Sequence, residues 1–368
     1  MDGMSGLVAS RYNQPIQFYL EYHMANNDWQ EFLFIKGAVF NNGTISSFGN
    51  TEKELTYAHT ENIICDLSHL DLLEITGDDA VTFLQGQVTN DVKLLNETQA
   101  HYTGYCSPKG RLLALFLAHA QDNKLYLQLN HKLAEPIVKR LKMYVLRAKV
   151  NISNISDNTV RIGLSGQDTP ALLSTFFTQI PQQAYETVHT DTATLIRLPG
   201  KQPRFEIIGN TEHIKTIWQT LKTSCKPVGK PCWEWLEIQA GIPDIVVTTQ
   251  EEFVPQMVNL DALGAINFKK GCYTGQEIVA RTHYLGKIKR RTQLAHIDTS
   301  APPQAGNDVV NANNEVIGKI VRSAPAPAGG FDVLAEIRLE ALAEAPAYWQ
   351  GAVLNILALP YSLQEKTT

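Results

Sequence analysis

The sequence predicts an α+β fold that ends in a small β-barrel, and three observations support this prediction. Patterns typical of strands and helices alternate through the first part of the chain. After Gly286 the helical periodicity stops, and only short strand patterns follow. The chain has 368 residues, 44% of them hydrophobic, which is enough for two or three domains with cores of their own.

The N-terminal third begins without a clear periodic pattern. Up to about residue 60 the chain is rich in Asn, Gly and aromatic residues, which favours strands and loops. Leu72–Gly77 is typical of a strand and a turn, and Asp78 can cap the following helix because its carboxylate accepts hydrogen bonds from first-turn amides. Thr98–Cys106 and Arg111–His119 predict a hairpin, since Pro and Gly stand in the four residues between them.

The middle of the chain alternates between the two periodicities. Lys124–Asn130 predicts a strand, and His131–Val145 predicts a helix with apolar residues at helical spacing. Gly241 can end a later helix in the left-handed conformation. The further elements that we expect are strands at Val160–Leu164, Thr194–Leu198 and Arg204–Ile208 and helices at Thr169–Thr178, Thr211–Thr223 and Cys232–Ala240.

Four short strand patterns follow Gly286. They are separated in part by Pro- and Gly-containing turns, and together they predict the small β-barrel. The patterns lie at Leu294–Ile297, Val316–Val321, Val333–Leu339 and Val353–Leu359.

Composition and charge exclude several classes of protein. A net charge of −5 argues against a protein that coats nucleic acid. The most continuous apolar stretch, Leu112–Ala118, is too short to cross a bilayer, and MDGMSGLVAS lacks the features of a secretory signal. Five cysteines without a C-x-x-C pair argue against a disulfide framework and against a zinc ribbon. We therefore expect a cytoplasmic protein without membrane contact and without a metal site of its own.

The segment KKGCYTGQEIVAR, which begins at Lys269, is the strongest candidate for chemistry. Thr274 and Glu277 fit a capping box, so Cys272 would lie two residues before a helix N-terminus, where an anion is favoured. Lys269 and Lys270 precede the cysteine. The helix N-terminus and the charges of the lysines both lower a thiol pKa. The alternative is that Cys272 is a small buried residue at an ordinary turn.

A basic cluster overlaps this segment. Between Lys269 and Arg291 the chain carries seven basic residues against one acid, Glu277. Such a cluster can bind a polyanionic ligand tail, a phosphate or RNA, and the alternative is a solvated basic surface. The basic residues are Lys269, Lys270, Arg281, Lys287, Lys289, Arg290 and Arg291.

Two tryptophans in CWEWLEIQAG are candidates for ligand stacking. Aromatic faces stack on planar heterocycles, although a lone tryptophan is more often part of a core. Residues two apart on a helix point in different directions, so Trp233 and Trp235 should lie in different environments. Other site classes lack support, since the sequence has no G-x-x-x-x-G-K-[ST], G-x-S-x-G or H-E-x-x-H motif.

The segment FKKGCYTGQEIVAR closely resembles the signature of the YgfZ family of folate-binding proteins, within the superfamily of the glycine cleavage T-protein, an aminomethyltransferase. The resemblance covers roughly residues 60–363, and its KGCYTGQE core is highly specific. The other segments that carry it are Ile75–Gly77, Leu84–Asp91, Phe253–Gln256, Asn259–Leu260, Ala262–Gly264 and Leu359–Leu363.

The resemblance implies a T-protein-like ring of three domains around a central hole that receives tetrahydrofolate or a one-carbon derivative. We expect a folate-binding region of two intertwined α+β domains over residues 1–285 and the barrel over residues 286–368. Lys270 and Cys272 correspond to the functional pair of the family, and Trp233 to a tryptophan linked to folate binding. Leu70 lies where some relatives carry a second tryptophan, and its aliphatic side chain provides less stacking.

One departure separates the chain from the aminomethyltransferases. The resemblance implies that in those enzymes the hairpin corresponding to Ser107–Leu113 is followed by an acidic residue implicated in catalysis, whereas this chain has Ala114 and Leu115. Neither side chain can accept a proton, which argues against aminomethyl transfer by that mechanism. The aminomethyltransferases, in turn, lack the cysteine of KGCYTGQE.

The resemblance thus implies a folate-binding accessory protein that supports iron–sulfur enzymes, such as a tRNA methylthiolase, and thereby tRNA modification. Cys272, assisted by Lys270, would act on a folate-borne one-carbon unit or transiently hold sulfur or iron. Two alternatives stay open: a folate-dependent transferase acting on an amine or on RNA, and a binding module whose basic cluster holds RNA.

Overall fold

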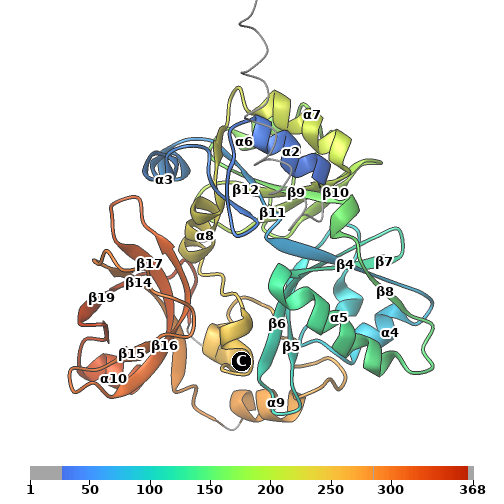
Figure 1. The fold of residues 1–368 in the computed structure, drawn as a ribbon. Coiled ribbons are helices and arrows are strands. Elements are labelled where there is room, and N and C mark those ends of the chain that lie inside the picture. The colour runs from blue at the N-terminus through green and yellow to red at the C-terminus, as the bar shows by residue number, and fades with distance from the viewer. Residues whose placement is uncertain (1–26, 285, 364–368) are drawn as a thin grey trace, which may run out of the picture.

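The computed structural model describes residues 27–284 and 286–363, and Figure 1 shows how their elements are arranged. The described strands form a six-stranded sheet, a five-stranded sheet, a two-stranded hairpin and a closed barrel. The C-terminal part of the chain builds the barrel, on the left of Figure 1. The predicted α+β class with a C-terminal β-barrel is therefore confirmed. The opening MDGMSGLVAS, for which we predicted no secretory signal, lies outside the described residues.

Two helices, α2 (Asn27–Ile35) and α7 (Thr211–Leu221), pack together beside the six-stranded sheet. Trp29 and Trp218 from these helices meet edge to face, with ring centroids 5.6 Å apart, in the core of this unit. The sheet order is β10 (Thr187–His189), β11 (Ala193–Leu198), β12 (Arg204–Gly209), β9 (Val160–Ser165), β3 (Ile63–Asp66) and β13 (Lys226–Val228).

The prediction of strands and loops before about residue 60 is wrong for the two helices found there. Besides α2, helix α3 spans Thr51–Thr60, and only the hairpin of β1 (Val39–Asn41) and β2 (Thr44–Ser47) fits the prediction. The Asn50 side chain caps α3 by accepting a hydrogen bond of 2.9 Å from Lys53 N. Helix α3 buries only three residues, so its apolar pattern is too sparse to show helical periodicity.

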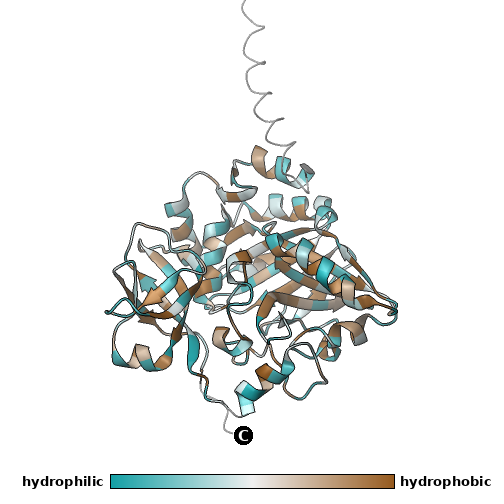
Figure 2. Cartoon of the chain, turned by 60° about the horizontal axis from the view of Figure 1, so that its bottom comes forward, coloured by the Kyte–Doolittle hydropathy of each residue, from teal (hydrophilic) through white to brown (hydrophobic). Residues whose placement is uncertain are grey.

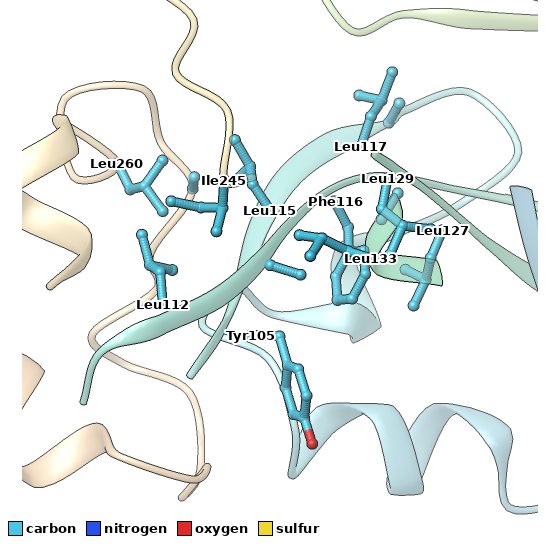
Figure 3. Close-up of a cluster of buried hydrophobic side chains, with 14 of the residues drawn as sticks. Tyr105, Leu112, Leu115, Phe116, Leu117, Leu127, Leu129, Leu133, Ile245 and Leu260 are labelled. Carbon is cyan, nitrogen blue, oxygen red and sulfur yellow. The ribbon is translucent and has the colours of Figure 1, made fainter. Parts of the chain in front are cut away.

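The five-stranded sheet contains the predicted hairpin and lies under helix α5 (His131–Val145), whose bounds match the prediction. Figure 3 shows part of its core, where Phe116 and Leu127 from the strands lie beside Leu133 from α5. Nearly every residue of the second hairpin strand is buried. The sheet order is β5 (His101–Cys106), β6 (Leu112–Gln121), β7 (Lys124–Asn130), β4 (Leu70–Thr76) and β8 (Asn151–Asn154).

Asp78 does not cap a helix, contrary to the prediction. Helix α4 spans Ala80–Gln85, and Asp79 holds the N-cap position without a side-chain capping bond. Both carboxylates instead hold Lys149: Asp79 Oδ2 accepts from its backbone N at 2.8 Å, and Asp78 Oδ2 from Nζ at 2.9 Å. The two carboxylates thus bind Lys149, which is distant in sequence, and not the first-turn amides of α4.

Helix α6 is shorter than predicted, since it spans Thr169–Leu173 and does not continue to Thr178. The Ser174 hydroxyl donates to Ala171 O at 2.6 Å, a local bond that competes with helix propagation. Helix α8 spans Lys230–Gln239, and Gly241 follows it with a φ of 68°, as the left-handed C-cap prediction requires.

The barrel begins with strand β14, at Arg290, and has a core separate from those of the two sheets. Short helix α10 (Leu339–Glu344) follows its third long strand. The division of the chain at residues 285 and 286 stays a prediction. Around the barrel the order is β14 (Arg290–Ile297), β17 (Phe331–Arg338), β16 (Val316–Pro325), β15 (Asp308–Val310), β18 (Tyr348–Trp349) and β19 (Ala352–Leu357).

Hydropathy follows this architecture. Figure 2 shows hydrophobic residues along the strands and a mixture of hydrophobic and hydrophilic residues on the outer helices. Such one-sided helices cover a core with one face and meet solvent with the other. Among the described residues, no helix combines the length and the apolar character that crossing a bilayer requires.

Replacing Gly77 with Ala should destabilise the protein strongly. Gly77 has a φ of 111°, and an added Cβ would lie 2.1 Å from Lys149 O, so both backbone strain and a steric clash oppose the side chain. We expect a loss of about 2–4 kcal/mol in the free energy of unfolding, measured by urea denaturation. Gly37→Ala is the matched control, because Gly37 has a φ of 95° and open space around it. Equal losses in both variants would contradict the clash.

Candidate functional site

The signature segment is held against the residues that follow helix α4. Asn267 N donates to Thr89 O at 3.0 Å, and Thr89 Oγ1 donates to Ala265 O at 2.7 Å. Farther along, Thr274 N donates to Gly86 O at 3.3 Å. Two segments about 180 positions apart in sequence therefore form one structural unit.

Lys270 is the central contact of this unit. Its Nζ donates to Val88 O at 2.6 Å and to Asn90 O at 2.7 Å, and the side chain is buried. Burial lowers the pKa of Lys270 to about 8, although the charge of Asp91 opposes the shift. The ammonium group lies 5.1 Å from the ring centroid of Tyr273. Lys270 thus fixes the backbone that leads to the cysteine.

Cys272 is exposed, unlike the other four cysteines, all of which are buried. The helix start predicted at Thr274 is wrong, because α9 begins at Gln276, so Thr274 and Glu277 do not hold the N-cap and N3 positions. Gly275, with a φ of 81°, stands before the helix, and a Cβ there would lie 2.5 Å from Ser107 O. Close packing on the tip of the β5–β6 hairpin therefore sets where the helix starts, and it leaves Cys272 accessible on the loop.

The predicted basic cluster does not form one surface. Lys270 is bound to carbonyl groups, Arg290 pairs with Glu336 at 2.9 Å, and Arg291 Nη2 donates to Asp261 Oδ2 at 2.8 Å. Three of the seven cations are thus committed to internal partners. The exposed cations that remain are Lys269, Arg281, Lys287 and Lys289.

Trp233 and Leu70 line one small cavity, which we call the ring cavity. The Trp233 ring packs on Gly163, where a Cβ would lie 2.4 Å from it, and the Arg204 guanidinium lies 4.7 Å from its centroid. The cavity encloses about 50 Å³. Its lining also includes Tyr102, Leu115, Leu117, Gln128, Asn130, Leu198, Glu206, Glu237, Asp244 and Arg322.

Trp235 lies elsewhere, as helical spacing predicts. Its Nε1 donates to Asp332 Oδ2 of the barrel at 2.8 Å, and His59 meets its ring edge to face. The two tryptophans therefore differ in role, since Trp233 faces a cavity while Trp235 joins helix α8 to the barrel.

Two polar residues in the ring cavity were missed by the sequence analysis. Gln128 Nε2 donates to Glu206 Oε2 at 3.1 Å, while Glu206 Oε1 and Gln128 Oε1 are buried without a partner among the described residues. Burial raises the pKa of Glu206 to about 7. For Glu206 the signal was present in Arg204–Gly209, where a Glu stands between Phe205 and Ile207 in a fully buried strand.

A buried ion network forms one wall of the ring cavity. Arg322 of the barrel lies 2.7 Å from Glu234 and 3.6 Å from Glu237, and Glu237 also pairs with Arg204. Burial alone would raise the pKa of Glu234, but the charges of Arg322 and Lys230 lower it to about 2. Glu234 is therefore ionised and neutralised by cations.

Apolar residues occupy the position after the β5–β6 hairpin turn at which we expect a carboxylate in an aminomethyltransferase. Ala114 and Leu115 are buried on β6, and Leu115 lines the ring cavity. The carboxylates of that cavity come from other elements: Glu206, Glu237 and Asp244. Within residues 27–284 and 286–363, no group of three or more His, Cys, Asp or Glu side chains is arranged to hold a metal ion.

Comparisons with known proteins agree on one family. Residues 8–270 match the family of the GCVT N-terminal domain. The tRNA-modifying protein YgfZ of Colwellia psychrerythraea is 34% identical over 251 residues, which are 68% of this chain and 76% of that protein. The glycine cleavage system aminomethyltransferase T of Bartonella henselae superposes with a TM-score of 0.71 at 16% identity, covering 90% of this chain and 96% of that one. This structural likeness confirms the predicted T-protein-like fold.

Replacing Gly163 with Ala should displace the Trp233 ring, because the new Cβ would lie 2.4 Å from two of its atoms. We expect a loss of about 1–3 kcal/mol in the free energy of unfolding and an altered tryptophan emission spectrum. Gly271→Ala is the control, since Gly271 has no neighbour within 4 Å of an added Cβ. An unchanged spectrum in Gly163→Ala would show that the ring is not held there.

Proposed function

The chain belongs to the YgfZ proteins of the GCVT family, and from this premise we propose that it binds tetrahydrofolate or a one-carbon derivative in the ring cavity. The ligand would support a role in tRNA modification, as the name of the Colwellia relative suggests. We place this role in the cytoplasm, where tRNA is modified.

The observation that carries this proposal is the pair of unpartnered acceptors, Glu206 Oε1 and Gln128 Oε1, beside the Trp233 ring. The pterin ring of a folate is flat and carries amide and amino N–H donors along one edge. A buried acceptor without a partner is costly, and a ring that donates to it removes that cost. The aromatic and aliphatic walls supply stacking and apolar contact.

Leu70 and Trp233 would contact the ring from different elements of the cavity. Leu70 begins strand β4 and is half-buried, while Trp233 is buried on helix α8. A cavity of about 50 Å³ is smaller than a two-ring heterocycle, so side chains at its mouth must shift when the ligand enters.

We assign Cys272 the reactive role and Lys270 a positioning role with it. The thiol is exposed on a loop that Lys270 fixes to Val88 and Asn90, so it is accessible from solvent to a one-carbon carrier, a sulfur donor or a partner protein. A lysine pKa of about 8 leaves part of Lys270 neutral near neutral pH. The partners that we propose are iron–sulfur enzymes such as a tRNA methylthiolase.

A second candidate function is a folate-dependent transferase. Its support is Glu206, a buried carboxyl group with a pKa of about 7, because such a group can accept a proton from a bound substrate at neutral pH. The apolar Ala114 and Leu115 argue against the glycine-cleavage reaction itself. A turnover assay with tetrahydrofolate and candidate amines distinguishes this function from accessory binding.

Replacing Glu206 with Gln should weaken tetrahydrofolate binding roughly 10- to 100-fold, since a charged acceptor is lost. Titration by tryptophan fluorescence measures this change. Wild-type affinity should increase as the pH rises through about 7, because the carboxyl group then ionises, and Glu206→Gln should lack this dependence. Glu31→Gln, on an exposed face of α2, is the control. Equal affinity in all three proteins would exclude the ring cavity as the binding site.

Replacing Cys272 with Ala should leave folding and tetrahydrofolate affinity unchanged, because the side chain is exposed and lies outside the ring cavity. The same change should abolish support of iron–sulfur enzymes in cells, measured as the methylthiolated fraction of tRNA. Complementation equal to that of the wild-type protein would refute the assigned role of the thiol.

A further inference from the structure

A second and larger cavity lies next to the ring cavity. It encloses about 790 Å³, and Asn130, Asp244 and Arg322 line both spaces. We call it the outer cavity. Its remaining charged lining is Asp71, Lys132, Arg161, Lys230 and Glu234.

Arg161 in this lining is a buried cation without an ion-pair partner among the described residues. The residue is 2% exposed, and Nη2 donates to Leu70 O at 2.6 Å. Its Nε and Nη1 are buried and have no acceptor within the described part of the chain. A buried charge with unsatisfied donors is unfavourable, and an anion that accepts hydrogen bonds from it would remove this cost.

The carboxylates whose charges act on Arg161 are engaged by other groups. Asp66 accepts hydrogen bonds from Trp29 Nε1 and the Ser68 hydroxyl. Asp71 lies 2.8 Å from a ring nitrogen of His131 and accepts from Asn154. The third, Glu206, accepts from Gln128 in the ring cavity. Among the described residues none of these carboxylates forms an ion pair or a hydrogen bond with Arg161, so its Nε and Nη1 remain available to another acceptor.

Two further groups surround the same space. His69 is buried, the charges of Lys230 and Arg161 act on it, and its Nε2 lies 3.6 Å from Glu234 without a hydrogen bond. Burial lowers the pKa of His69 to about 3, so the imidazole is neutral. Glu234 is paired with Arg322 at 2.7 Å and also lies 4.0 Å from Lys230 Nζ, so Lys230 is shared between this carboxylate and the cavity, whereas Arg161 has no ion pair among the described residues.

We propose that Arg161, with Lys230 and His69 beside it, forms an anion-binding site in the outer cavity for a carboxylate or phosphate group. Charge-assisted hydrogen bonds from a guanidinium suit both groups. The anion has two sources: the glutamate tail of a folate whose ring occupies the neighbouring cavity, or a free small anion. The site follows from its own residues and exists whether or not the proposed folate function is right.

The test compares wild-type protein with Arg161→Met and Lys230→Met, and with Lys139→Met on an exposed face of α5 as the control. Inorganic phosphate and glutarate are the anion probes, and calorimetry and thermal unfolding are the measurements. We expect anion binding to weaken roughly 10- to 100-fold in Arg161→Met and several-fold in Lys230→Met, with no change in Lys139→Met.

Tetrahydrofolate and tetrahydropterin, which lacks the tail, distinguish the two sources. If Arg161→Met weakens tetrahydrofolate binding and spares tetrahydropterin, the anion is the tail. If only phosphate and glutarate are affected, the anion is free. Tetrahydropterin also separates this proposal from the folate function, because it reports on the ring cavity alone.

The proposal is wrong if neither anion probe binds the wild-type protein and the variants bind tetrahydrofolate as wild type does. It is also wrong if Arg161→Met weakens tetrahydropterin and tetrahydrofolate equally, or if Lys139→Met matches the cavity variants. Should Arg161→Met fail to fold, Lys230→Met is the deciding variant, because the Lys230 side chain is partly exposed. If Lys230→Met then binds every probe as wild type does, the proposed site is wrong.

Discussion

The buried ion network around helix α8 is the constraint on which the rest of the structure depends. Arg322 of the barrel bonds Glu234 and the carbonyl of Ile242, and the network continues through Glu237 to Arg204 of the six-stranded sheet. Removing one partner would leave a buried charge unpaired, which costs about 3–5 kcal/mol. The network therefore fixes the position of the barrel relative to the sheet, and with it the helix that carries Trp233.

A second constraint sets the position of the thiol. The signature loop has little regular structure of its own, yet hydrogen bonds with Gly86–Asn90 hold it from Ala265 to Thr274. Lys270 gives two charge-assisted bonds to this arrangement, which explains why a lysine can be buried there. The accessible thiol and the group that fixes the loop thus belong to different residues: Cys272 is exposed, and Lys270 is buried.

The two cavities have complementary chemistry along one continuous lining. The ring cavity offers acceptors without partners beside an aromatic face, whereas the outer cavity offers a guanidinium whose Nε and Nη1 are unused among the described residues. Glu206 and Arg161 come from the neighbouring strands β12 and β9 of one sheet, where Glu206 pairs with Gly163 and Ile208 with Arg161. A single sheet face therefore carries polar groups of opposite sign toward neighbouring spaces.

The sequence by itself determined the α+β class, the barrel, the β5–β6 hairpin and the family, because local periodicity and a contiguous motif are readable without tertiary contacts. It also identified Cys272, Lys270, Trp233 and Leu70 as candidates. Tertiary structure alone decided that Lys270 is buried on carbonyl groups and that the basic cluster is divided among internal partners. Glu206 and Arg161 emerged only there, since whether a lone charge in a strand has a partner depends on residues far away in the chain.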